Sequence, residues 1–172
     1  NYSEQVYGQG GFLPRFVSHE RGTGNASPMY VYRWEQMLEL LELYKNWDGD
    51  PYEGILIEYV DPLRGRPIYN TMTFFAQMLR PGERTLPLKQ NASILLAPLE
   101  GSGYSIIDGE RFDWAPYDTV AAPGGHWCEH VNGSQTDRAI LFVASDEPTL
   151  KTLGFYSKFG KTDSGEIIRL DR

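Results

Sequence analysis

The sequence predicts an all-β domain, a sandwich or a closed barrel, preceded by one helix. From residue 55 onward, short runs with alternating apolar residues recur at nearly even spacing, and they are rich in β-branched and aromatic side chains. Turn-forming pairs such as Pro81-Gly82 separate these runs. Asp108-Gly109 is the strongest hairpin signal in the chain, because both central residues of such a turn need a positive φ.

The first 50 residues are expected to form an arm followed by an amphipathic helix. Residues 1–28 are rich in glycine and polar side chains and show no periodicity, which is typical of an arm or an interdomain connection. Over residues 33–45, apolar side chains from Trp34 to Tyr44 recur three and four positions apart, which predicts a helix. The stretch from Asn46 to Pro51 breaks this pattern.

Residues 51–156 carry the predicted strands. Strands are expected at Ile55–Val60, Thr71–Leu79, Ser93–Ala97, Tyr104–Ile107, Thr119–Ala122, Glu129–Val131 and Ala139–Ala144. A short helix is predicted from Glu147 to Leu153, where Ser145 or Asp146 caps the start and Gly154 ends the helix. Residues 157–172 form a polar C-terminal tail, which is expected to be loose after Gly160.

Charge and hydropathy exclude two classes of partner. The chain has 16 lysine and arginine residues against 23 acidic ones, a net charge of −7, and no basic patch, so nucleic-acid binding is disfavoured. No apolar run approaches the ~20 residues that a membrane-spanning helix needs. Cys128 is the only cysteine and the N-terminal residues lack a signal-peptide pattern, which together predict a reducing, cytoplasmic setting.

One cluster of candidate metal ligands stands out. His126, Cys128, Glu129 and His130 lie within five residues, whereas nucleotide-binding loops, GxSxG elbows and CxxC pairs are absent from the sequence. On a strand, positions 126, 128 and 130 share one face at a spacing of about 6.6 Å. One ion could bind two of these neighbours but hardly all three, so a complete site would need ligands from another strand.

Two spaced motifs resemble the signatures of cupin barrels. Gly82 and Gly101 stand at the two glycines of the first signature, G-x5-H-x-H-x3-E-x6-G. The second signature, G-x5-P-x-G-x2-H-x3-N, matches at Pro123, Gly125 and Asn132 and has a tyrosine, at position 117, in place of its first glycine. The resemblance implies a cupin barrel, also called a double-stranded β-helix or jelly roll, with an N-terminal arm and helix and a short C-terminal helix.

Every metal-ligand position of these signatures is replaced. Leu88 and Gln90 stand for the first two histidines, Ile94 for the glutamate and Cys128 for the last histidine. Leucine and isoleucine have no lone pair to offer, an amide is a weak neutral ligand, and burial in an apolar barrel would keep a lone thiol protonated. The resemblance therefore implies a barrel that keeps the cupin turns and has lost its metal ion.

A closer resemblance covers most of the chain. Residues 51–156 are similar to the C-terminal cupin of the gentisate 1,2-dioxygenase family, which includes salicylate and 1-hydroxy-2-naphthoate dioxygenases. The similar segments are Tyr59–Leu63, Leu79–Glu83, Glu100–Tyr104, Phe112–Trp114, Trp127–Ser134, Ser145–Pro148 and Leu153–Tyr156. The resemblance implies that Fe(II) is held by three histidines in a partner N-terminal cupin, of the same protein or within a homo-oligomer, and that this chain carries no cofactor and no catalytic residue.

Three interpretations follow from these motifs. The first is a metal-free C-terminal half of a two-barrel, ring-cleaving dioxygenase, with a structural and oligomerising role. The second is a free-standing metalloenzyme with a rearranged site at His126, Cys128 and His130, helped by Gln90. The third is a barrel that binds a small ligand through Gln90, Cys128 and His130 in an apolar pocket.

Overall fold

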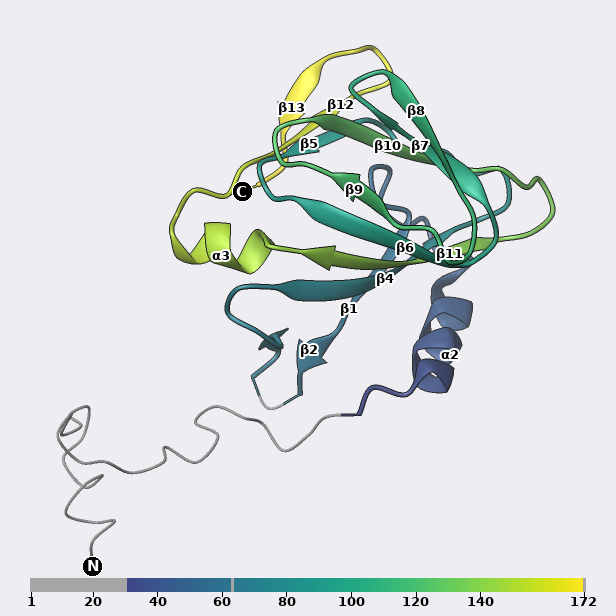
Figure 1. The fold of residues 1–172 in the computed structure, drawn as a ribbon, viewed down its shortest axis with the longest axis horizontal. Helices are drawn as coiled ribbons and strands as arrows, with labels where there is room; N and C mark the ends of the chain where they lie inside the picture. Colours follow the sequence, from purple (N-terminus) through teal and green to yellow (C-terminus); the bar gives the residue numbers. More distant parts are fainter. Residues whose placement is uncertain (1–30, 63, 172) are drawn as a thin grey trace, which may run out of the picture. The chain divides into compact units, whose positions relative to one another are not determined.

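Two antiparallel sheets face each other in the computed structural model, which describes residues 31–62 and 64–171 (Figure 1). The arm predicted over residues 1–28 lies outside the described residues. One sheet has five strands in the order β1 (Ile55–Glu58), β4 (Thr73–Leu79), β11 (Ala139–Ser145), β6 (Ile94–Glu100) and β9 (Val120–Ala122). The other sheet has six strands, β13 (Ile167–Arg169), β12 (Lys158–Lys161), β5 (Leu88–Gln90), β10 (Trp127–Asn132), β7 (Gly103–Ile107) and β8 (Glu110–Trp114).

The strand order confirms the predicted all-β architecture. Neighbouring strands are mostly distant in sequence, as in a jelly roll, and the long strands β4 and β11 pair along their whole length from Ala139↔Leu79 to Ser145↔Thr73. A small third sheet pairs β2 (Val60–Asp61) with β3 (Arg66–Pro67). No helix among the described residues is long and apolar enough to cross a bilayer.

Two apolar clusters lie on opposite faces of the five-stranded sheet. Between the sheets, fully buried Leu79, Leu96 and Leu141 form the barrel core. On the outer face, the predicted helix is present as α2 (Trp34–Tyr44), and its Met37 and Leu41 pack against alternate strand residues, which are Ile55, Ala76, Met78 and Ile140. This helix and its apolar stripe therefore follow from the spacing seen in the sequence.

The predicted hairpin turn is present, whereas Asp146, at the N-cap of the last helix, makes no capping hydrogen bond with its side chain. Asp108 and Gly109 have φ values of +47° and +90° and join β7 to β8 in the expected hairpin. In α3 (Glu147–Thr152), the hydroxyl of Ser145 accepts a hydrogen bond from the backbone N–H of Glu147 at 3.1 Å, whereas the side chain of Asp146 instead accepts from the N–H of Ser93.

Tyr117 occupies an unusual backbone position. It stands where the second cupin signature has its first glycine, and its φ is +79°, in the left-handed region that glycine adopts without cost. Its side chain is fully exposed, so no packing fixes this conformation. A non-glycine residue therefore adopts here a conformation that only glycine adopts without strain.

The expectation of a loose C-terminal tail is wrong over residues 158–169. β12 pairs with β5, with Lys158 opposite Gln90, and β13 pairs with β12, so the six-stranded sheet extends beyond the predicted end of the barrel at residue 156. Gly160 allows this pairing, because a Cβ there would lie 2.4 Å from the ring of Tyr52. The carboxylate of Asp171 accepts a hydrogen bond from the backbone N–H of Lys158 at 2.9 Å and so anchors the hairpin.

Candidate functional site

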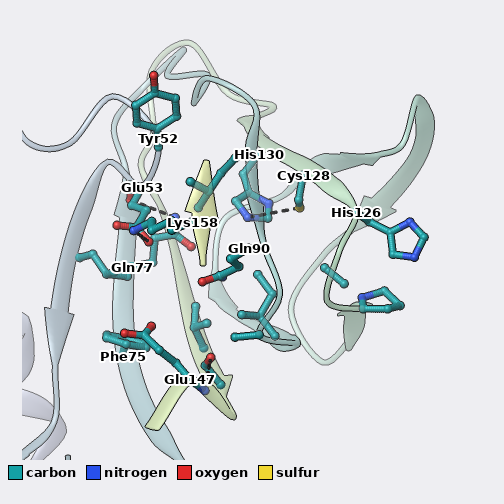
Figure 2. Close-up of a pocket in the computed structure, with 18 residues that line it drawn as sticks. Tyr52, Glu53, Phe75, Gln77, Gln90, His126, Cys128, His130, Glu147 and Lys158 are labelled. Carbon is teal, nitrogen blue, oxygen red and sulfur yellow. Dashed lines mark hydrogen bonds and ion pairs between the residues drawn. The ribbon is translucent and has the colours of Figure 1, made fainter. Parts of the chain in front are cut away.

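A cavity of about 150 Å³ lies between the two sheets (Figure 2). All four replaced ligand positions line it, namely Leu88, Gln90, Ile94 and Cys128. β5 and β10 are hydrogen-bonded neighbours, with Leu88 opposite Cys128. The first and the last of the four replaced ligand positions therefore lie side by side. The structure therefore brings together the positions that the two sequence signatures place far apart along the chain.

His126 does not join this set. It lies in the turn before β10 with its side chain half exposed, and its Nδ1 is 2.5 Å from Oδ2 of Asp108 in the β7–β8 turn. Hydrogen bonds from His126 and from the backbone of Trp127 lower the pKa of the Asp108 carboxyl. Figure 2 shows the His126 ring turned away from Cys128 and His130. Within residues 31–62 and 64–171, no three His, Cys, Asp or Glu side chains are grouped to hold a metal ion.

One ring nitrogen of His130, Nδ1, belongs to a buried polar chain. The indole N–H of Trp114, which can only donate, points at the hydroxyl of Ser105 at 3.1 Å, and that hydroxyl lies 2.8 Å from Nδ1 of His130. Among the described residues, the Ser105 hydroxyl proton has no acceptor other than Nδ1, so we assign it there, and the imidazole proton is then on Nε2. Burial lowers the pKa of His130 to about 4, so the ring is neutral near pH 7.

Cys128 is a buried thiol. Its Sγ lies 3.8 Å from Nε2 of His130, and burial together with the charge of Glu129 raises its pKa to about 12. Glu129 itself does not face the cavity, because its carboxylate makes a two-point ion pair with Arg84 at 2.8 and 3.0 Å. Near neutral pH, Cys128 is therefore a weak donor without the thiolate that a metal ion needs.

The cavity also holds polar residues that the sequence motifs did not point to. Lys158 on β12 forms an ion pair with Glu53 at 2.8 Å, and burial raises the pKa of Glu53 although Lys158 opposes the shift. The Gln77 side chain donates to the carbonyl oxygen of Glu53 at 2.9 Å, and the Tyr156 hydroxyl donates to Oε1 of Gln90 at 3.0 Å. The ion pair depends on β12, whose Lys-Phe-Gly-Lys sequence has no strand-like alternation.

This donor set does not fit iron. The former ligand positions offer two hydrocarbon side chains, one amide and one protonated thiol, and the nearby imidazole directs a proton, not a lone pair, toward Cys128. A facial iron site in a non-haem oxygenase needs three converging side chains with lone pairs free for the metal ion, such as histidines or carboxylates. The cavity is instead lined by a mixture of apolar, amide and charged side chains.

Proteins of similar sequence are ring-cleaving dioxygenases. The 5-aminosalicylate 1,2-dioxygenase of Comamonas sp is 34% identical over 131 residues, which are 75% of this chain and 34% of that enzyme. Gentisate 1,2-dioxygenase 1 of Aquipseudomonas alcaligenes is 31% identical over 134 residues, which are 77% of this chain and 38% of that enzyme. The chain thus spans a little over a third of the length of these curated relatives.

Solved structures agree with this relationship. The salicylate 1,2-dioxygenase from Pseudoaminobacter salicylatoxidans, in an adduct with gentisate, superimposes with a TM-score of 0.70 at 25% identity, over 94% of this chain and 44% of that one. No protein-family model matches the sequence. The described residues are therefore a cupin barrel, and the chain is homologous to the gentisate 1,2-dioxygenase family of ring-cleaving enzymes.

Proposed function

We propose that the chain is the metal-free C-terminal cupin of a two-barrel dioxygenase that cleaves hydroxylated aromatic acids, with Fe(II) in an N-terminal partner barrel. Its similarity to a little over a third of each relative leaves room for a second barrel in the whole protein. The relatives are named for 5-aminosalicylate and gentisate, which are hydroxylated aromatic acids. In this proposal the protein is cytoplasmic, and the chain supports catalysis without taking part in the chemistry.

The observation that carries the proposal is the chemistry of the former ligand positions. Leu88, Gln90, Ile94 and Cys128 all line one cavity, which supports a barrel that keeps the arrangement of a cupin metal site without its donor atoms. The pKa of about 12 at Cys128 removes the single remaining soft ligand near neutral pH.

Exposed apolar side chains support a structural role. Leu95 and Leu99 on β6 are about half exposed, at 48% and 47%, and lie outside the stretch of the five-stranded sheet that α2 covers. At the end of α2, Leu43 and Trp47 are each 64% exposed. Apolar surface of this kind commonly marks protein–protein contacts, and here it is suited to burial against the sister barrel or another copy.

Metal analysis with a ligand-restoring variant tests the metal-free assignment. The chain is expressed in iron-supplemented medium, purified without chelator, and its iron and manganese are measured per chain. We expect well under one tenth of an ion in the wild type, and a clear gain in the triple variant Leu88→His/Gln90→His/Cys128→His, because histidine is the cupin ligand at these positions. Stoichiometric iron in the wild type that is lost in His130→Ala would overturn the proposal and support the rearranged metalloenzyme.

The gene's reading frame tests the two-barrel assignment independently. An in-frame upstream cupin with an intact H-x-H motif is expected, and the intact mass of the native protein should then be two to three times that of this chain. A stop codon directly before the codon for Asn1 would contradict the assignment.

A further inference from the structure

The cavity between the sheets has the size of a small aromatic ring. Its volume is about 150 Å³, and an engineered protein cavity of ~150 Å³ lined by apolar side chains binds benzene. Its apolar lining includes Phe75, Ile94, Val143 and Ala122. Pro123 and His126 also line the cavity and are exposed at the surface, so it is reachable from solvent there.

The lining also presents polar groups whose hydrogen-bonding capacity is not used up. Gln77 is 4% exposed and donates through Nε2, and its Oε1 has no partner among the described residues. Gln90 accepts through Oε1 from Tyr156, so its two N–H donors are without a partner in the described part of the chain. Nε2–H of His130 meets only the sulfur of Cys128, at 3.8 Å. Buried polar atoms of this kind are costly unless a bound molecule completes them.

The charge in the cavity selects against anions. Lys158 is the only lysine or arginine among the lining residues, and it is already paired with Glu53. Glu147 lines the cavity as well and is paired with Lys151, so a ligand carboxylate would find no lysine or arginine among the lining residues that is available to pair with it. Burying an unpaired carboxylate costs far more than burying a hydroxyl that forms hydrogen bonds.

We infer that this cavity binds a small uncharged aromatic molecule with a single hydroxyl, of which phenol is the simplest. The ring would lie against Phe75, the hydroxyl oxygen would accept from the N–H groups of Gln90 or His130, and the hydroxyl proton would go to Oε1 of Gln77. This binding site goes beyond the structural role proposed above, and it requires only that no metal ion fills the same space.

Titration of the full chain with phenol tests the inference, with benzoate as the charged comparison. We expect saturable binding in ligand-observed NMR with a dissociation constant of about 1 mM or tighter, and an at least tenfold weaker response to benzoate. Ala122→Leu fills the cavity from β9 and should abolish binding. Its matched control is Ala121→Leu, the neighbouring residue, whose exposed side chain does not line the cavity and whose replacement should leave binding unchanged. Gln90→Met keeps the volume, removes the donors, and should weaken binding roughly fivefold.

Three results would overturn the inference. The first is that the wild type, shown to be folded by circular dichroism, does not bind phenol saturably. The second is that the wild type and Ala122→Leu bind phenol equally well. The third is that benzoate binds as tightly as phenol. Metal content is measured on the same samples, so that an ion filling the cavity, which would defeat the proposed function, is distinguished from a metal-free cavity that does not bind phenol.

Discussion

Replacing Ser105 with alanine should leave two buried groups without a hydrogen-bond partner. The Ser105 hydroxyl, which is 0% exposed, accepts from the indole N–H of Trp114 at 3.1 Å and donates to Nδ1 of His130 at 2.8 Å. Trp114 and His130 are 2% and 5% exposed, so water does not replace the lost contacts. An unsatisfied buried donor or acceptor costs about 1–3 kcal/mol, so Ser105→Ala should lower the free energy of unfolding by about 2–5 kcal/mol.

Urea denaturation near pH 7.5 measures this loss directly. Ser102→Ala is the matched control, because that side chain is exposed in the turn before β7 and should change the free energy of unfolding by no more than about 0.5 kcal/mol. The ¹⁵N shifts of His130 provide a second measurement, since the hydrogen-bond chain places the proton on Nε2 in the wild type. A loss below 1 kcal/mol, or a wild-type imidazole protonated on Nδ1, would refute the argument for this polar chain.

Three further outcomes are expected. His130 has a pKa of about 4 in the folded protein against an ordinary value of 6.5, so between these pH values the unfolded chain binds a proton that the folded chain does not. The free energy of unfolding should therefore fall by up to about 3 kcal/mol as the pH drops from 6.5 to 4. This contribution of His130 to the pH dependence should vanish in His130→Gln. Cys128, with its pKa of about 12, should resist a thiol reagent at pH 8 in the native state and react at once in guanidinium. Tyr117→Gly should raise the free energy of unfolding by about 0.5–1 kcal/mol, because it relieves a left-handed residue with an exposed side chain.

Each of these expectations has a control and a contrary result. A pH profile that is identical in wild type and His130→Gln would show that other groups dominate the acid response. Rapid labelling of native Cys128 would mean that the thiol is accessible. The control for Tyr117→Gly is Tyr69→Gly, because Tyr69 is also exposed but its backbone lies outside the left-handed region. Tyr69→Gly should not stabilise the protein. A loss of stability in Tyr117→Gly would contradict the backbone argument.

Local sequence signals predicted the parts of the fold that depend on neighbouring residues. The apolar spacing from Trp34 to Tyr44 gave the helix, and Asp108-Gly109 gave the hairpin, because backbone conformation at these places is set within a few residues. Strand β5 was missed because it has three residues, Leu88–Gln90, too few for an alternating pattern to be recognised.

The candidate site was predictable only through the spaced cupin signatures. They single out Leu88, Gln90, Ile94 and Cys128, and all four residues line one cavity. The ion pair of Lys158 with Glu53 was not foreseeable, because it joins two segments that are distant in sequence through strand β12. Side-chain contacts between strands depend on register, which local composition does not encode.

The C-terminal hairpin matters for anyone who shortens this protein. Ending the chain at residue 156 would remove Lys158 and leave Glu53 without its cation, and it would uncover the hydrogen-bonding edge of β5. An unpaired strand edge can form hydrogen bonds with another chain, so the truncated protein should aggregate although every turn of the two cupin signatures is still present. A soluble fragment therefore has to run through Asp171, whose carboxylate holds the start of β12 in place.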